Sequence, residues 1–159
     1  MHAWVKTGFW VGLVVLVVIQ IVRPQKTNPA IDPAKDLAAD VTVPAEIAGM
    51  FVRSCNDCHS DHTVWPWYSH IAPVSWLVVS DVNRGRRGVN FSEWGSYATD
   101  KRSKVLEAIC KEVTEGDMPP ITYAPMHSSA KLTKADAQEI CRWTAATRQT
   151  IAASDGVKP

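Results

Sequence analysis

The chain has 159 residues, which is the size of about one domain and excludes repeat arrays and multidomain enzymes. Hydrophobic residues make up 46% and charged residues 21% of the chain, a composition that argues against a disordered protein. The formal net charge of +1 argues against a general nucleic-acid binder, which would carry a basic excess. The charge is unevenly placed, because the first 26 residues hold three basic side chains and no acidic one.

The chain begins with an apolar segment. Between Gly8 and Val22 the only polar side chain is Gln20, and the apolar character extends back to Ala3. About 20 helical residues would span roughly 30 Å, the thickness of a bilayer's hydrocarbon core. We therefore predict an uncleaved transmembrane anchor over residues 1–22. A cleaved signal peptide is the alternative, but no small-residue cleavage site follows the apolar run.

Residues 23–43 are predicted to form a semi-rigid linker. Large apolar residues are few there, and prolines recur in and directly after the segment, at Pro24, Pro29, Pro33 and Pro44. We expect this linker to hold a single domain, residues 44–153, a short distance from the membrane.

The domain itself is predicted to be all-α. No strict alternation of apolar and polar residues supports a strand, whereas helical spacing recurs four times. The first predicted helix starts at Pro44, and the second spans Pro73–Val82, before Gly85. The third runs from Thr99 or Asp100 to a terminator at Gly116. The fourth starts at a capping box over residues 133–136. Loops are expected over 60–72, 84–98 and 117–131. Four short helices bury little core, so another component is expected to supply packing.

One motif carries specific chemistry. Cys55, Cys58 and His59 form C-x-x-C-H, the attachment signature of c-type haem. Two thiols at this spacing can each form a thioether to a haem vinyl group, and the adjacent imidazole can ligate the iron as the proximal ligand. One covalently attached haem c would also supply the missing core.

Two other interpretations of the cysteines are weaker. A zinc site would need a second ligand pair, but Cys110 and Cys141 are isolated and lie 31 positions apart. A thioredoxin-like dithiol would need a βαβ context. We expect Cys110 and Cys141 to form a disulfide between the third and fourth helices, since both fall on apolar faces and the compartment would be oxidising. Two separate buried thiols are the alternative.

Around this motif the sequence resembles the bacterial haem-binding-domain family of membrane-anchored monohaem c-type cytochromes. The resemblance spans residues 44–150. It rests on the segments Cys-Asn-Asp-Cys-His-Ser at 55–60, Trp-Pro-Trp-Tyr-Ser-His-Ile-Ala-Pro-Val-Ser-Trp at 65–76, 81–86, Asn-Phe-Ser-Glu-Trp at 90–94 and Glu-Gly-Asp-Met-Pro-Pro at 115–120. It implies an exported protein with a small cytochrome c-like helical domain around one haem.

Aromatic and basic residues are candidates for the haem pocket. The expected pocket wall consists of Trp65, Trp67, Trp76 and Trp94, for which loop packing is the alternative. The strongest basic cluster is Arg84, Arg86 and Arg87, and the guanidinium groups of Arg84 and Arg86 are suited to pair with a haem propionate. Solvated surface or membrane contact is the alternative for this cluster.

The sixth iron ligand has two candidates in the loop before the last helix. Met118 is the first choice, because Pro119 and Pro120 favour an extended loop that can present a thioether from the far side of a haem. His127 is the second choice, and its imidazole would lower the reduction potential relative to Met/His ligation.

We expect a carrier of single electrons between redox proteins on the periplasmic face, rather than a catalyst, with no small-molecule substrate and no nucleic acid as partner. Haem c is attached outside the cytoplasmic membrane, so the anchor would be N-inside and the domain periplasmic. One alternative is a subunit of a larger respiratory or photosynthetic complex, for which Gly8 and Gly12 offer a weak helix-packing motif. Another is a haem peroxidase or gas sensor with an exchangeable sixth ligand.

Overall fold

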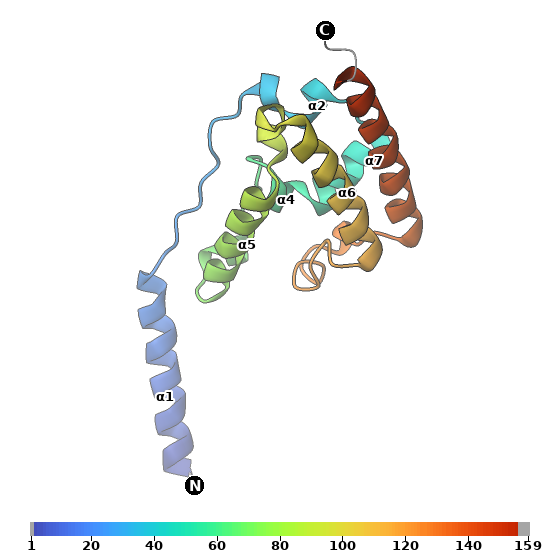
Figure 1. Ribbon diagram of the computed structural model, residues 1–159. Coiled ribbons are helices and arrows are strands. Elements are labelled where there is room, and N and C mark those ends of the chain that lie inside the picture. The colour runs from blue at the N-terminus through green and yellow to red at the C-terminus, as the bar shows by residue number, and fades with distance from the viewer. Residues whose placement is uncertain (1, 156–159) are drawn as a thin grey trace.

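Figure 1 shows the computed structural model, which describes the backbone of residues 2–155 and the side chains of residues 4–154. Helices form all of its regular structure, and no strand occurs among the described residues, as predicted. The α-helices are α1 (His2–Val18), α2 (Leu37–Asp40), α3 (Ala45–Ser54), α4 (Asn56–His59), α5 (Val74–Gly88), α6 (Thr99–Glu115) and α7 (Lys134–Asp155). The 3₁₀ helices are η1 (Ile19–Ile21), η2 (Pro33–Lys35), η3 (Trp67–His70), η4 (Phe91–Ser96) and η5 (Ser128–Ala130).

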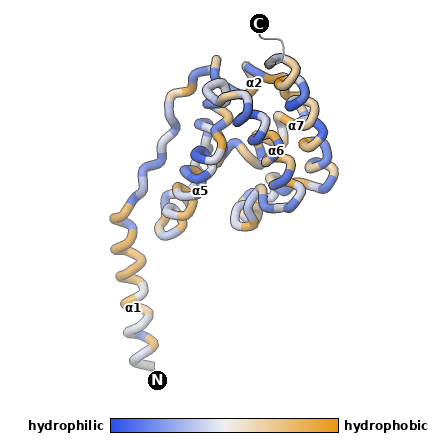
Figure 2. Tube along the Cα trace, viewed as in Figure 1, coloured by the Kyte–Doolittle hydropathy of each residue, from blue (hydrophilic) through white to orange (hydrophobic). Residues whose placement is uncertain are grey.

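The N-terminal helix extends away from the helical domain (Figures 1 and 2). Its apolar window covers 18 residues, Trp4–Ile21, and none of that window is buried against the protein. At 1.5 Å per residue this window is about 27 Å long, which matches the hydrocarbon core of a bilayer. By length and composition, one N-terminal helix is therefore able to span a membrane, as predicted.

The second half of the predicted linker belongs to the domain instead. Asp32 and Asp36 cap the short helices η2 and α2 through their carboxylates. Leu37 is buried in the core, and Asp40 accepts a hydrogen bond of 2.8 Å from the indole of Trp94. The first half of the segment carries no helix, whereas the second half, from Pro33 onward, forms short helices that pack on the core.

The core lies where α3, η4, α6 and α7 meet. The Phe51 ring on α3 stacks on Phe91 at a centroid distance of 5.1 Å and meets Trp143 of α7 edge-on at 5.4 Å. A disulfide joins Cys110 of α6 to Cys141 of α7 and confirms the predicted pairing. The disulfide and the packing between the two helices hold α6 and α7 side by side, as Figure 1 shows.

Two helix boundaries lie where the sequence predicted them, and one does not. Gly116 ends α6 in the left-handed conformation with φ of 81°, and Thr133 and Asp136 form the predicted capping box before α7. The α5 helix, however, continues through Gly85 and ends at Gly88, so part of the predicted 84–98 loop is helical. The added turn of α5 packs against α4.

Candidate functional site

The C-x-x-C-H segment forms a single tight turn. The α3 helix ends at Ser54, and Cys55 forms the turn between α3 and α4. The carbonyl oxygen of Cys55 accepts hydrogen bonds from the amides of Cys58 (3.1 Å) and His59 (2.9 Å). This turn leaves both cysteines partly buried with free sulfurs. The side chains of Cys55, Cys58 and His59 consequently line the same cavity.

The His59 ring is held in one orientation. Its Nδ1 atom lies 3.1 Å from the carbonyl oxygen of Val89. Because a carbonyl oxygen only accepts, Nδ1 carries the proton and Nε2 keeps its lone pair. Burial lowers the pKa of His59, against the raising effect of backbone hydrogen bonds with Val89 and Gly85. The ring is therefore a neutral imidazole oriented as a metal-ligating histidine requires.

The two thiols are protonated at neutral pH. Burial is the main cause that raises the pKa of Cys55 to about 12 and that of Cys58 to about 11. A redox-active dithiol normally has a lowered thiol pKa instead. The second cysteine pair that a zinc site would need is already consumed in the Cys110–Cys141 disulfide. Both observations weaken the alternatives to haem attachment.

Helix α5 packs directly on this turn through Gly85. A Cβ atom at Gly85 would lie 2.3 Å from the carbonyl oxygen of Cys58 and 3.1 Å from its Cβ. Only a residue without a side chain allows this approach. Sequence reasoning assigned Gly85 to the end of a helix and missed its packing role, which no local pattern reveals.

Met118 lies on the same cavity as His59. The end of α6 places it there, since the amides of Gly116, Asp117 and Met118 all donate to the carbonyl oxygen of Glu112. An apolar cavity adjoins the first one and shares part of its lining. The residues common to both are Ser54, Cys55, His59, Gly88 and Met118. The apolar part is completed by Val89, Phe91, Val105, Ala108, Ile109 and Val113, beside Glu112.

These residues fit a haem. Two free thiols, an oriented imidazole and a thioether converge on a space with one largely apolar side, while the other side carries Asp81 and Arg84. A porphyrin needs this combination, because its ring is apolar, its iron takes nitrogen and sulfur ligands, and its propionates are charged.

His127 lies in a neighbouring groove. Its ring stacks on Tyr123 at a centroid distance of 3.8 Å, and its Nε2 lies 3.3 Å from the hydroxyl of Tyr68. This groove contacts Cys58 and Asp57 but not His59. Of the two predicted sixth ligands, the structure therefore brings only Met118 to the cavity of His59.

Sequence reasoning missed the contact that holds this loop. The hydroxyl of Tyr123 donates to the carboxylate of Asp57 at 2.7 Å, inside the C-x-x-C-H motif. Burial, with this hydrogen bond, raises the pKa of Tyr123 far above its usual value. Asp57 also accepts a hydrogen bond from the amide of Val64. Asp57, one of the two variable positions of the C-x-x-C-H motif, thus links the loop of Tyr123 and the loop of Val64 to the site.

The four predicted pocket tryptophans are not brought together. Trp94 is fully buried in the core, Trp65 donates to the Asn28 side chain, and Trp76 donates to the carbonyl oxygen of Val22. Trp67 is 71% exposed and lines the groove of His127. None of the four lines the cavity of His59.

The arginines divide into different roles. Arg84 lines the cavity and forms an exposed pair with Asp81 at 2.7 Å, which leaves it accessible to an anionic group. Arg86 is largely buried, pairs with Asp61, and donates to the carbonyl oxygens of Ser60 and Thr27 and to the Asn28 side chain. It does not line the cavity of His59. Arg87 is exposed and does not line the cavity.

Comparison with known proteins addresses the identity of this site. A family model described as haem-binding domain matches residues 14–146, which include the C-x-x-C-H turn, α5, α6 and Met118. The comparisons with curated proteins and with solved structures gave no match. The match covers most of the chain, and the cavity carries the donors that the family's cofactor requires. The chain belongs to the haem-binding domain family.

Proposed function

We propose that the protein is a membrane-anchored monohaem c-type cytochrome that carries single electrons between redox partners on the periplasmic face. The observation that carries this proposal is the convergence of Cys55, Cys58, His59 and Met118 on one cavity, with Nδ1 of His59 bonded to the Val89 carbonyl. Each of these groups matches one requirement of covalent attachment or axial ligation.

The residues have separate roles in this proposal. Cys55 and Cys58 would form the two thioethers, and Nε2 of His59 and the Met118 sulfur would ligate the iron. A bound haem supplies a reversible one-electron iron couple. The protein sets the potential through the axial pair and through burial of the apolar wall. Arg84, on the polar side, is the partner for a propionate.

Two observations support the proposed location. The α1 window has the length of a membrane span, and the Cys110–Cys141 disulfide is typical of an oxidising compartment such as the periplasm. An anchor with its N-terminus inside places the domain where c-type haem is attached.

Covalent attachment is tested by producing the full chain in a bacterium that attaches haem to exported proteins. Wild-type protein should retain haem after denaturing electrophoresis. Cys58→Ala and His59→Ala should yield little stable holoprotein, because each removes one attachment or ligation point. The matched control is Cys110→Ala, which removes a cysteine outside the motif and should keep the haem. Full covalent haem in Cys58→Ala would refute the c-type assignment.

The carrier role has its own test. Reduced wild-type protein should titrate as a single one-electron centre and bind carbon monoxide only weakly, because both axial positions are filled by protein. Rapid, tight binding of carbon monoxide would instead favour a gas sensor or peroxidase. Purification in mild detergent should yield the cytochrome alone, and stable co-purifying membrane subunits would favour a complex.

A further inference from the structure

One end of the helical domain exposes a cluster of large apolar side chains. They lie on η3, on the turn after it and on the first half of α5, and we call them the apolar edge: Trp67, Ile71, Val74 and Leu77. Trp67 is 71% exposed and Leu77 61%. Across the groove of His127, the 117–131 loop adds Met126, which lines the groove. Ile121, which is 87% exposed, lies in the same loop between the groove residues Pro120 and Thr122. Figure 1 shows this loop and the start of α5 at the same end of the domain, toward α1.

Hydrogen bonds connect the residues next to the apolar edge to η1 and Val22, which directly follow α1. The Gln20 side chain donates to the carbonyl oxygen of Ala72 at 3.1 Å and accepts from the Ala72 amide at 2.9 Å. The indole of Trp76 donates to the carbonyl oxygen of Val22 at 2.8 Å. Ala72 directly follows Ile71 in the sequence, so these bonds fix the edge beside residues 20–22.

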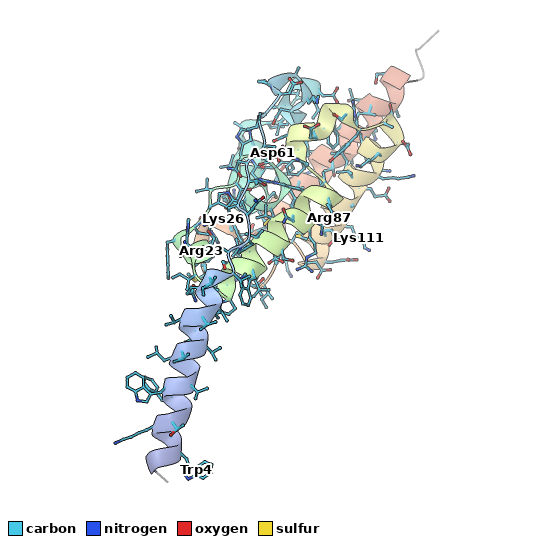
Figure 3. The ribbon with its side chains drawn as sticks, turned by 90° about the vertical axis from the view of Figure 1, so that its left-hand side faces the viewer. Trp4, Arg23, Lys26, Asp61, Arg87 and Lys111 are labelled. Carbon is cyan, nitrogen blue, oxygen red and sulfur yellow. A yellow bond between two sulfur atoms is a disulfide. The ribbon has the colours of Figure 1, made fainter. Side chains whose placement is uncertain are left out.

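These hydrogen bonds determine the level of the apolar edge relative to a membrane that α1 spans. The apolar window of α1 ends at Ile21, one residue after Gln20. When α1 spans a membrane, Gln20 therefore lies at the boundary of the hydrocarbon core, and Ala72 lies at the same level. The first charged residues after the window, Arg23 and Lys26, lie beside this end of the domain in Figure 3. If the window spans a bilayer, these two cations follow the hydrocarbon core and can reach the lipid headgroups.

We propose that the apolar edge docks the domain onto the lipid surface, with its side chains immersed in the headgroup region next to the anchor. Contiguous exposed apolar side chains are unusual on a soluble surface and mark interaction sites. Tryptophan favours the membrane interface, where its ring is apolar and its N–H is polar. Lipid is the occupant because the hydrogen bonds to α1 bring this edge, rather than another face, to the bilayer boundary. The inference rests on the membrane-spanning role of α1 in the proposed function.

Photo-cross-linking of the full-length holoprotein tests this proposal. Benzoylphenylalanine is placed at Leu77 or at Ile121, and each variant is reconstituted into vesicles of phosphatidylethanolamine and phosphatidylglycerol. Val14 in α1 is the lipid-embedded control. Ala152 is the solvent control, since it is exposed near the end of α7, at the far end of the domain from α1. Lipid adducts are then measured by mass spectrometry.

Leu77 and Ile121 should each give several-fold more lipid adduct than Ala152. Adduct at the Ala152 level, with Val14 strongly labelled, would overturn the docking and leave the anchor intact. Cross-links from Leu77 to a second protein chain in place of lipid would overturn it in favour of a protein partner. Failure of Val14 to label would show that α1 is outside the bilayer, which removes both the anchor and the docking but leaves the covalent haem test unaffected.

Discussion

The α-carbon of Gly85 lies against the carbonyl oxygen of Cys58, so close that an added methyl group would be 2.3 Å from that oxygen. Real Cβ atoms essentially never approach so closely, and the nearest atoms belong to backbone that cannot rotate away. Helix α5 therefore contacts the C-x-x-C-H turn backbone to backbone. The adjacent end of α5 then leads into Val89, whose carbonyl oxygen accepts from His59.

Gly85→Ala should separate α5 from the C-x-x-C-H turn. We expect a loss of about 1–3 kcal/mol in the free energy of unfolding, as for other overpacked cores, together with a reduced yield of holoprotein. Urea denaturation and haem content per protein measure the two effects. Gly49→Ala in α3 is the matched control, because Gly49 is exposed, lines neither cavity and has no atom within 4 Å of its added Cβ. Equal stability of the two variants would show that α5 does not pack as described.

Arg86 and Arg84 should differ strongly in their effect on stability. Arg86→Ala removes the partner of Asp61, whose side chain is only 3% exposed, and the hydrogen bonds to the Ser60 and Thr27 carbonyls. Breaking a buried ion pair on one side typically costs about 3–5 kcal/mol. Arg84→Ala breaks an exposed pair and should cost less than about 1 kcal/mol. Thermal or urea unfolding compares them, and similar losses would contradict these roles.

The parts of the fold that followed from the sequence depend on local signals. Gly116 ends α6 because only glycine adopts its backbone angle readily, and Thr133 with Asp136 caps α7. Both effects act within a few residues. The role of Leu37 was missed because its burial depends on core residues far along the chain, although the Asp36 cap beside it was a readable local signal.

The same distinction applies to the site. Cys55, Cys58 and His59 are close in sequence, so their pattern alone indicated the chemistry. The sequence alone did not show which of Met118 and His127 lines the cavity of His59, because both follow α6 in one loop. It depends on the Glu112 carbonyl that holds Met118 and on the Tyr123 ring that holds His127.

The disulfide should contribute substantially to stability. Cys110 and Cys141 enclose a loop of 31 positions, for which the chain-entropy model gives about 3–4 kcal/mol. Cys110→Ser with Cys141→Ser should lower the free energy of unfolding by an amount of this order while haem stays attached. Alkylation of unfolded, unreduced holoprotein should modify neither cysteine. Two modified thiols would mean that the disulfide does not form.

The final prediction concerns the sixth ligand. Oxidised wild-type protein should show the weak near-infrared band of sulfur–iron ligation. Met118→Ala should abolish this band and open the iron to carbon monoxide, because Met118 is the only one of the two candidates that shares a cavity with His59. Methionine ligation also raises the reduction potential relative to two imidazoles, so the loss of Met118 should lower it.

His127→Ala is the matched control for this assignment. Its ring stacks on Tyr123 and lines the neighbouring groove, so its removal should leave the near-infrared band and the weak carbon monoxide binding of the wild type unchanged. The His127 ring also lies beside Tyr68, so a modest loss of stability in this variant is compatible with the assignment. If the native protein lacks the band, and His127→Ala rather than Met118→Ala opens the iron, the cytochrome is bis-histidine. The loop after α6 would then have to rearrange on haem binding, since His127 would have to leave its stack on Tyr123 to reach the iron.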